Sequence, residues 1–259
     1  MLAARACSTF TLARGIMGAP ALIHPITGQV NVAQLAAEIT AIRDRAFDEK
    51  LRLQADFPAL NPANDVRITC FSKFQNVLGS LQLGCGFWGL NLLSTDWWNR
   101  NTSYPEPDRP ILRNEFQMFL KLALVQFLFS AVESSLRVFM RAIDAGAHAG
   151  ASVEFKRVYD DLLLKRLVTP TPGHVELLDT VARIRNTIHN NGVYFHKSGR
   201  DAHQAYRGQT YKFIHGKPVE VGGWPLLLSI ADDLLSLMRD VVRDPSIAGI
   251  AGNIVDPGS

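Results

Sequence analysis

The stretch ILRNEFQMFLKLALVQFLFSAVESSLRVFMRAID, residues Ile111 to Asp144, decides the fold class of this 259-residue chain. Apolar residues recur along it at spacings of three and four, which predicts one unusually long helix. Between Phe116 and Val132 they lie on nearly all sides of that helix. Such a helix is enclosed by others, either at the centre of a bundle or at a subunit interface. The stretch therefore predicts a mainly α-helical, antiparallel bundle.

Two apolar stretches raise the question of a membrane span. Phe74 to Thr95 holds no charged residue and is followed by Trp97-Trp98, a pair typical of membrane interfaces. Four glycines and several polar residues dilute that stretch, while Lys121 and Gln126 interrupt the long helix. We therefore expect both stretches to be buried in the protein, and we expect no membrane partner.

The uncharged stretch also contains GCGFWG, Gly84 to Gly89, which matches the G-x-G-x-x-G pattern of dinucleotide-binding turns. That turn connects a strand to a helix, and its glycines let the backbone approach the phosphates closely. No alternation of strands and helices surrounds the motif here, and the bulky Phe87 and Trp88 occupy its turn. The pattern indicates a buried segment, and we expect no cofactor.

Helical periodicity and chain breakers divide the chain into ranges. The clearest internal boundary is SYPEPDRP, Ser103 to Pro110, which has three prolines in eight residues. The expected ranges are a tail at 1–30, an N-terminal helical extension at 31–109, the bundle at 110–245 with an insertion at 192–223, and a flexible C-terminal tail at 246–259.

Further helices and one hairpin are predicted from periodicity within these ranges. The short turn after Leu167 indicates that the helices on either side of it are antiparallel neighbours. Gly208 to Val221 instead alternates loosely around His215-Gly216, which predicts a small β-hairpin in the insertion. The additional predicted helices are Asn31–Phe57, Ser152–Leu167, Thr171–Asn190 and Trp224–Asp244.

The overall composition leaves the function open. The net charge of +3 permits contact with nucleic acid without arguing for it, and no polybasic run strengthens that signal. Three widely spaced cysteines without a CxxC pair fit a reducing cytoplasm. The opening MLAARACSTFTLARGIMGAP has arginines but no acidic residue. It fits an organelle transit peptide, a disordered tail, or an over-extended start with Met17 nearby.

The residues that suggest chemistry lie in VARIRNTIHNNGVYFH, Val181 to His196. On a helix, Arg185 and His189 are four residues apart and share a face, so they can address one ligand together. Arg183 is six residues before His189 and points elsewhere. The alternative interpretation is an ordinary helix end, because cations in the last turn complement the helix dipole and Asn-Asn-Gly terminates the helix.

A second feature lies in the long helix, where Glu133 and Arg137 form an i,i+4 pair just past its most apolar part. A carboxylate buried there needs a partner, because an isolated buried charge is costly. That partner is either Arg183 or Arg185 on a neighbouring helix, or simply Arg137 at the bundle surface.

A helical bundle with these features resembles the HEPN domains of prokaryotic toxin and defence ribonucleases. The motif of that family is an arginine, four to six further residues and a histidine, with a polar residue such as Asn after the arginine. Arg183 and His189 have five residues between them, but Ile184 follows this arginine. Arg185 is followed by Asn186, but only three residues separate it from His189. The sequence therefore leaves the choice of arginine open.

The resemblance covers roughly Ile111 to Asp244 and implies a metal-independent endoribonuclease. In that chemistry His189 transfers the proton of the RNA 2′-hydroxyl or positions the phosphate, which suits an imidazole with an ordinary pKa of about 6.5. Arg183 or Arg185 stabilises the phosphate charge with its fixed planar donors. The resemblance also implies supporting residues, which are Glu133, Asn186 and Asn190.

The same resemblance implies RNA as the substrate and a homodimer in which two motif helices face one cleft. It also implies an antitoxin or another regulatory protein as a partner, and it does not account for residues 31–109. The competing class is a non-catalytic helical bundle that serves as a binding or regulatory module.

The insertion adds further polar residues whose role is open. Tyr194, Tyr206, Arg207 and Lys212 could supply stacking and phosphate contacts to single-stranded RNA, or be ordinary surface residues. Several histidines gather near Asp201, but their spacings match no compact ligand motif, and we expect no metal site. These histidines are His189, His196, His203 and His215.

Overall fold

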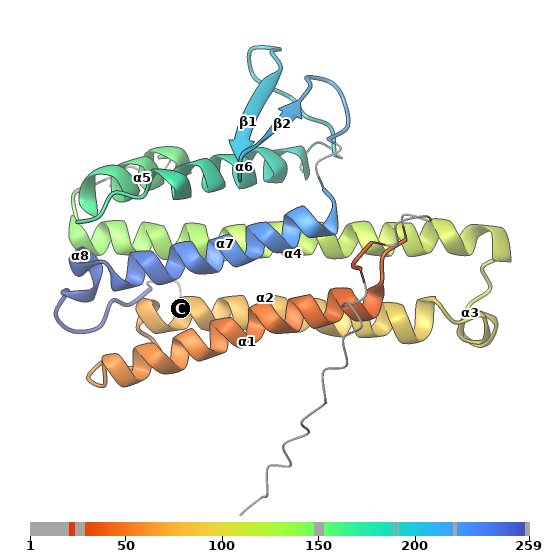
Figure 1. The fold of residues 1–259 in the computed structure, drawn as a ribbon, viewed down its shortest axis with the longest axis horizontal. Helices are drawn as coiled ribbons and strands as arrows, with labels where there is room; N and C mark the ends of the chain where they lie inside the picture. The colour runs from red at the N-terminus through yellow and green to blue at the C-terminus, as the bar shows by residue number, and fades with distance from the viewer. Residues whose placement is uncertain are drawn as a thin grey trace, which may run out of the picture.

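The computed structural model describes residues 21–23, 29–147, 153–188, 190, 192–219 and 222–256. Within them the helices pair into three layers, and a small β-hairpin stands on the third layer (Figure 1). The layers are α1 (Val32–Asp56) with α2 (Val66–Phe87), α4 (Arg109–Ile143) with α7 (Trp224–Arg243), and α5 (Phe155–Asp161) with α6 (Pro172–Ile188). Residues 1–20, to which the targeting interpretation applies, lie outside the described residues. His189 does so as well.

The central element is α4 (Arg109–Ile143), which confirms the long helix predicted from the sequence. It packs against α2, α6 and α7. Its side chains at Leu124, Leu128 and Val132 are buried, as an apolar stripe at a spacing of four requires. The mainly α-helical fold expected from this stretch is therefore confirmed.

The N-terminal region forms the first layer from α1 (Val32–Asp56) and α2 (Val66–Phe87). Asn31 and Asp65 cap the two helices by accepting hydrogen bonds from the first backbone N–H groups. Both helices contribute to the same continuous apolar core as α4 and α7. The ranges 31–109 and 110–245 therefore share one core.

Between α2 and α4 the chain forms three short helical elements. They are the π-helical turn η1 (Trp88–Leu92), α3 (Thr95–Asn101) and the 3-10 turn η2 (Glu106–Asp108). The three-proline segment is thus a connection between two helices that pack on each other. The GCGFWG motif runs through α2 into η1, so it forms no strand-to-helix turn that could cradle a phosphate.

Gly84 lies where α2 approaches α4 most tightly. A Cβ atom at this position would lie 2.6 Å from Cδ2 of the buried Leu120, whereas a Cβ atom at Gly86 would meet nothing within 4 Å. Glycine at position 84 therefore permits the contact between the two helices, and Gly86 has no such role.

Changing each of these glycines to alanine should give opposite results. We expect Gly86→Ala to raise the free energy of unfolding by about 0.5–1 kcal/mol, because alanine is the better helix former. Gly84→Ala gains the same propensity but overpacks the contact with Leu120, which costs about 1–3 kcal/mol. Urea unfolding of the two variants tests this, and equal stabilisation by both would contradict the tight approach at Gly84.

The second half of the chain supplies the other layers. The two predicted helices of the third layer pack side by side and are joined by a short turn. The elements are α5 (Phe155–Asp161), the π-helical turn η3 (Leu162–Arg166), α6 (Pro172–Ile188), α7 (Trp224–Arg243) and the short α8 (Pro245–Ala248).

The insertion contains the expected β-hairpin, but with a different turn. Strands β1 (Ala202–Tyr206) and β2 (Gln209–Phe213) pair antiparallel around Arg207-Gly208. Both turn residues have positive φ, 48° and 73°, as a two-residue type I′ turn requires. The prediction of a turn at His215-Gly216 was wrong. Gly216 instead turns the chain back, and its N–H donates to the carbonyl of Tyr194 at 2.8 Å.

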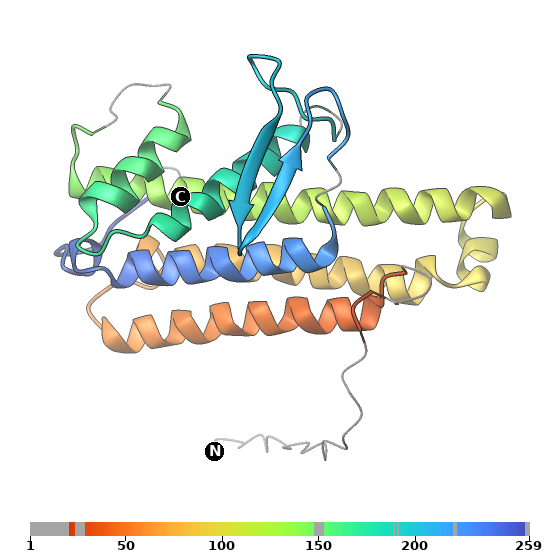
Figure 2. The ribbon, with the colours of Figure 1, turned by 45° about the horizontal axis from the view of Figure 1, so that its top comes forward.

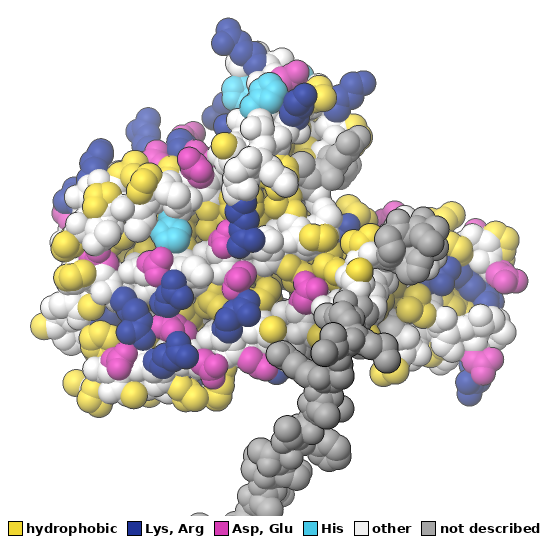
Figure 3. Space-filling model, in the orientation of Figure 1, with side chains coloured by type: hydrophobic (Ala, Val, Ile, Leu, Met, Phe, Trp, Pro, Cys, Tyr) yellow, Lys and Arg dark blue, Asp and Glu magenta, His cyan; other side chains and the backbone are white. Residues whose placement is uncertain are grey.

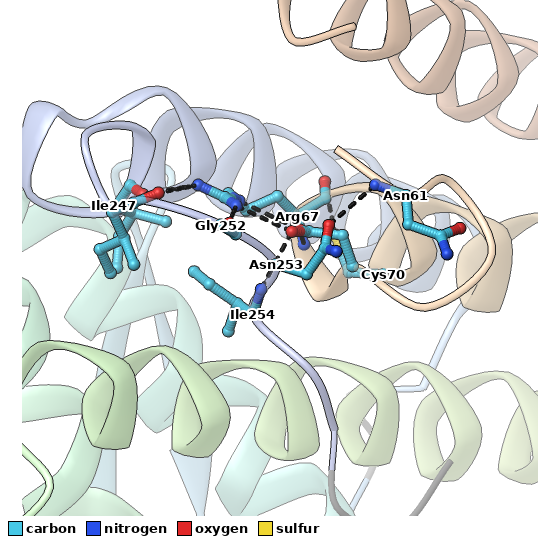
Figure 4. A network of polar contacts seen from close by, with 9 residues as sticks. Asn61, Arg67, Cys70, Ile247, Gly252, Asn253 and Ile254 are labelled. Atoms are coloured by element: carbon cyan, nitrogen blue, oxygen red, sulfur yellow. Dashed lines mark hydrogen bonds and ion pairs between the residues drawn. The ribbon is translucent and has the colours of Figure 1, made fainter. Parts of the chain in front are cut away.

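Residues 246–256 do not form the flexible tail that we expected for 246–259. Ile247 and Ile254 are buried in the core. The Arg67 side chain donates hydrogen bonds to the carbonyls of Ile247, Ile250 and Gly252 (Figure 4). The buried guanidinium of Arg67 thus ties this C-terminal segment to α2, although the proline and glycine content of the segment suggested a tail. In the predicted 1–30 tail, Leu22 and Val30 likewise pack against the core.

Among the described residues, one helical stretch, Glu106–Ile143, is long and apolar enough to cross a membrane. Half of its most apolar window (50%) is buried inside the protein. Lys121 lies within it, with its ammonium 5.8 Å from the ring centre of Trp224 on α7. Length and composition alone are weak evidence for a span, because the core helix of a bundle has the same properties.

Candidate functional site

Arg183 fastens the insertion to α6. Its Nε donates to the side-chain oxygen of Gln204 at 3.1 Å, and its Nη1 donates to the hydroxyl of Tyr194 at 3.2 Å. Both acceptors belong to the insertion, and both are buried. Because these bonds commit two of its N–H donors to the insertion, Arg183 is a structural clamp in the single chain.

Arg185 is held differently. Its guanidinium lies 5.6 Å from the ring centre of Phe129 on α4, in a cation–π contact. Its Nε is buried, and among the described residues it has no hydrogen-bond partner. Buried donors without an acceptor are rare in folded proteins, so the Nε of this positioned guanidinium is a donor still uncommitted within the described residues.

The end of α6 is closed by its own residues. The side-chain amide of Asn190 donates to the carbonyl of Asn186 at 3.0 Å, and the Gly192 N–H donates to the carbonyl of Thr187 at 2.8 Å. Gly192 has a φ of 82°, in the left-handed region that suits a helix end. The side chains of Asn186 and Asn190 are exposed. Asn190 therefore caps the helix immediately beside the position of His189.

Glu133 pairs with Arg137 on its own helix. The Arg137 Nη2 and Nε atoms lie 2.8 and 3.0 Å from the same carboxylate oxygen. Arg137 also donates to the carbonyl of Val153 and lies 5.5 Å from the ring centre of Phe155. Within the described part of the chain Glu133 has no ion pair with either arginine of α6. The structure therefore pairs Glu133 with Arg137 on its own helix, and not with Arg183 or Arg185.

A second anchor of the hairpin is Asp233 on α7, which the sequence did not single out. The Tyr206 hydroxyl donates to its carboxylate at 2.6 Å, and Arg207 donates two further bonds at 2.6 and 2.9 Å. Burial opposes ionisation of Asp233, but hydrogen bonds from Arg207 and Tyr206 outweigh it and lower the pKa of the carboxyl. Burial and the bond to Asp233 raise the pKa of the Tyr206 hydroxyl.

This anchor predicts a pH-dependent loss of stability. We expect Asp233→Asn to lower the free energy of unfolding by about 1–2 kcal/mol at neutral pH, because three hydrogen bonds lose their charged acceptor. The folded-state pKa is depressed, so the stabilisation is complete above the unfolded pKa of about 4 and is lost as the pH falls below it.

Urea unfolding of wild type and Asp233→Asn between neutral and acidic pH measures this difference. Asp232→Asn is the matched control, because Asp232 pairs with Arg45 at 2.6 Å on an exposed surface. Such a pair contributes about 0–1 kcal/mol. A difference between wild type and Asp233→Asn that grows with acid would contradict the account.

Two histidines of the insertion, His196 and His215, are engaged with neighbouring backbone and side-chain groups. Nδ1 of His215 accepts from the His196 N–H at 3.1 Å, and the His215 N–H donates to Asp201 at 2.8 Å. Across the residues that the structure describes, no three His, Cys, Asp or Glu side chains converge on a common point.

Cys85 is buried, which raises the pKa of its thiol to about 11. A thiol of this kind is a poor nucleophile.

The insertion has a positive net charge. Residues 192–223 contain five Lys or Arg and two acidic residues, so their net charge equals the +3 of the whole chain. Lys, Arg and His side chains gather at the end of the hairpin (Figure 3). Arg200, Lys212 and Lys217 of the insertion are exposed and have no ion pair to any described residue. Phe195 of the insertion is 54% exposed, and its ring centre lies 5.5 Å from that of His215. Basic and exposed aromatic side chains on one element suit a single-stranded polyanion.

Two surface hollows lie away from the end of α6. One, of about 420 Å³, lies between α1 and α7 and is lined by charges of both signs, among them Arg45, Glu49 and Arg239. The other, of about 280 Å³, lies beside the hairpin and includes His174 and Asp233. Neither is lined by the two arginines of α6.

The structure thus separates the roles of the predicted residues. It places Arg185 and Asn186 in the last turn of α6 and bonds Asn190, just beyond the helix, to the carbonyl of Asn186. It commits Arg183 to the insertion and pairs Glu133 with Arg137. Gln204 and Asp233 carry no signal in the sequence that would single them out, because their partners become neighbours only in the folded insertion. Comparison with protein-family models, curated proteins and solved structures gave no match to this chain.

Proposed function

We propose that this protein is a metal-independent endoribonuclease of HEPN type, with its phosphate-handling site at the end of α6. The observation that carries the proposal is the guanidinium of Arg185, which is held on Phe129 with its Nε uncommitted among the described residues and which lies four residues before His189 in the sequence. Because Arg183 is engaged by Gln204 and Tyr194, we assign the phosphate contact to Arg185.

The proposed reaction is an intramolecular transesterification of RNA. The 2′-hydroxyl oxygen attacks the adjacent phosphorus, the bond to the 5′-oxygen breaks, and a 2′,3′-cyclic phosphate forms. His189 removes the 2′-hydroxyl proton or positions the phosphate, and the departing 5′-oxygen takes up a proton. Arg185 stabilises the negative charge on the phosphate oxygens.

The charge of the insertion supports RNA as the substrate. Its unpaired basic side chains and the exposed Phe195 lie on the element that Arg183 fastens to α6. Phosphate contacts would come from the cations, and a base could stack on the aromatic ring. A homodimer and a neutralising antitoxin or regulatory protein remain part of the proposal as partners.

A second candidate function is a non-catalytic RNA-binding module. It is favoured by one observation: neither of the two surface hollows described above is lined by Arg185. The basic insertion would serve binding equally well in this case.

Product analysis separates the two functions. Purified protein is incubated with single-stranded RNA of mixed sequence in EDTA, and the fragments are analysed by mass spectrometry. The proposal predicts fragments ending in 2′,3′-cyclic phosphate and no cleavage of the 2′-deoxy analogue. RNA that is bound but intact would support the binding module, and cleavage of the 2′-deoxy analogue would exclude the proposed attack.

A further inference from the structure

The largest apolar surface of the described chain lies on an arm. The second half of α2, η1 and the first half of α4 extend beyond α6 and α7 (Figures 1 and 2). A ring contact between Phe87 of α2 and Phe116 of α4, with centres 5.7 Å apart, joins the two sides of the arm, and Phe119 lies 6.3 Å from Phe116 along α4. The exposed residues of this apolar arm surface are Leu83, Phe87, Leu90, Leu93, Ile111, Met118, Phe119, Leu122 and Phe127.

The spacing of these residues is that of a helix-packing face. Leu83, Phe87 and Leu90 follow one another at four and three residues, and Leu122 is four residues after Met118. Such spacings place side chains in a stripe that faces a neighbouring helix.

On α4 this stripe continues a face that is covered further along. Phe129 lies seven residues after Leu122, on the same side of the helix. It is packed under Phe155, with ring centres 5.4 Å apart, and under Arg185. Because α6 ends at Ile188, it covers this face of α4 no further. Toward Ile111 the apolar side chains on the same face of α4 are exposed.

The size of the apolar arm surface matches a protein partner. The nine side chains expose on the order of 1,000 Å² together, since a half-exposed side chain of this size contributes about 100 Å². The largest apolar patch on a typical monomer is about 300–600 Å². A stable interface buries about 800 Å² on each partner.

The distribution of charge favours a second copy of this chain. Around a two-fold axis each residue meets residues of its own kind, so charged groups near the axis would repel one another. The α2 side of the arm is uncharged from Phe74 to Thr95, and Glu115 is the acidic residue on the exposed α4 face. A lipid partner fits less well, because the tip of the arm carries Asp96, Arg100 and Glu106.

We propose that two copies of this chain associate through the apolar arm surface. The helices of one arm lie against those of the other and bury the part of the α4 face that α6 does not reach. This association names the surface for the homodimer included in the proposed function. It rests on the arm and not on ribonuclease activity, so a monomeric wild type would remove the dimer, and the cleavage assay would separately decide the activity.

The test measures the mass of the full chain in solution by light scattering and analytical ultracentrifugation. At about 10 µM, above the dissociation constant expected for an interface of this size, wild type should have the mass of two chains. Leu83→Glu combined with Phe119→Glu should raise the dissociation constant at least about 30-fold, because it places charges in a desolvated contact. Leu90→Arg, at an 80% exposed position, is an independent variant with the opposite charge.

Matched controls are Leu51→Glu and Val168→Glu, whose side chains are 46% and 65% exposed outside the arm. Both should remain dimeric, and circular dichroism should show that all variants are folded. A monomeric wild type, or a dimer that the arm variants leave intact, would overturn the proposal. So would a monomer that floats with vesicles of phosphatidylcholine and phosphatidylglycerol, in favour of a lipid partner.

Discussion

Replacing Arg67 with alanine should lower the free energy of unfolding by about 3–5 kcal/mol, the cost of breaking a buried ion pair from one side. Arg67 and Asp65 are both at most 1% exposed, and their closest charged atoms lie 2.8 Å apart. The change leaves the Asp65 carboxylate buried without its cation. It also removes the donor that binds the carbonyls of Ile250 and Gly252.

The second consequence of this change is local. Ile254 reaches the core partly because its N–H donates to Asp65 at 3.0 Å, so loss of the network should release the C-terminal segment. Urea unfolding gives the stability, and hydrogen exchange of residues 247–256 gives the local effect. We expect faster exchange there than in α7.

Two further variants show whether the buried charge is the cause. Arg67→Met combined with Asp65→Asn removes both charges and should recover part of the loss. Arg100→Ala removes an exposed partner of Asp96, 76% and 81% exposed, and should change stability little. Equal losses in Arg67→Ala and Arg100→Ala would contradict the structural role of the network.

The second large effect concerns the two arginines of α6. Arg185→Ala should lower kcat/KM for RNA cleavage by about 100–1,000-fold, as expected when a donor to a developing charge is lost. Stability should change little, because Arg185 makes no hydrogen bond to a described residue. Arg185→Lys should retain part of the activity, since it keeps the charge and loses the planar donors.

Arg183→Ala should behave in the opposite way. It leaves Gln204 and Tyr194 buried without their partner, so the free energy of unfolding should fall by about 1–3 kcal/mol. The thermal unfolding and the RNA cleavage rate of Arg183→Ala and Arg185→Ala are measured side by side. If Arg183→Ala abolishes cleavage at unchanged stability while Arg185→Ala cleaves normally, the two assignments must be exchanged.

Local periodicity accounts for the parts of the fold that the sequence predicts well. The long central helix and the helix from Trp224 follow from apolar spacing, which depends only on near neighbours in the chain. The C-terminal segment does not follow from such spacing. It is held by Arg67, about 180 residues earlier in the sequence, and its own proline and glycine content suggested a tail.

The hairpin and the site differ from expectation for similar reasons. His-Gly is the more obvious turn signal, but the turn falls at Arg207-Gly208, where Asp233 of α7 binds the arginine in its left-handed conformation. The motif spacing could not separate Arg183 from Arg185. The distinction depends on Gln204 and Tyr194, which reach α6 only through the fold of the insertion.

The most direct measurement of the proposed function is the cleavage rate of single-stranded RNA in EDTA by wild type and by His189→Ala at equal, verified folding. We predict cleavage by wild type without metal and a rate lower by about 100–10,000-fold in the variant, the contribution of a general acid–base residue. Equal cleavage by the two proteins, or no cleavage of any RNA by wild type, would contradict the assignment of the reaction to the end of α6.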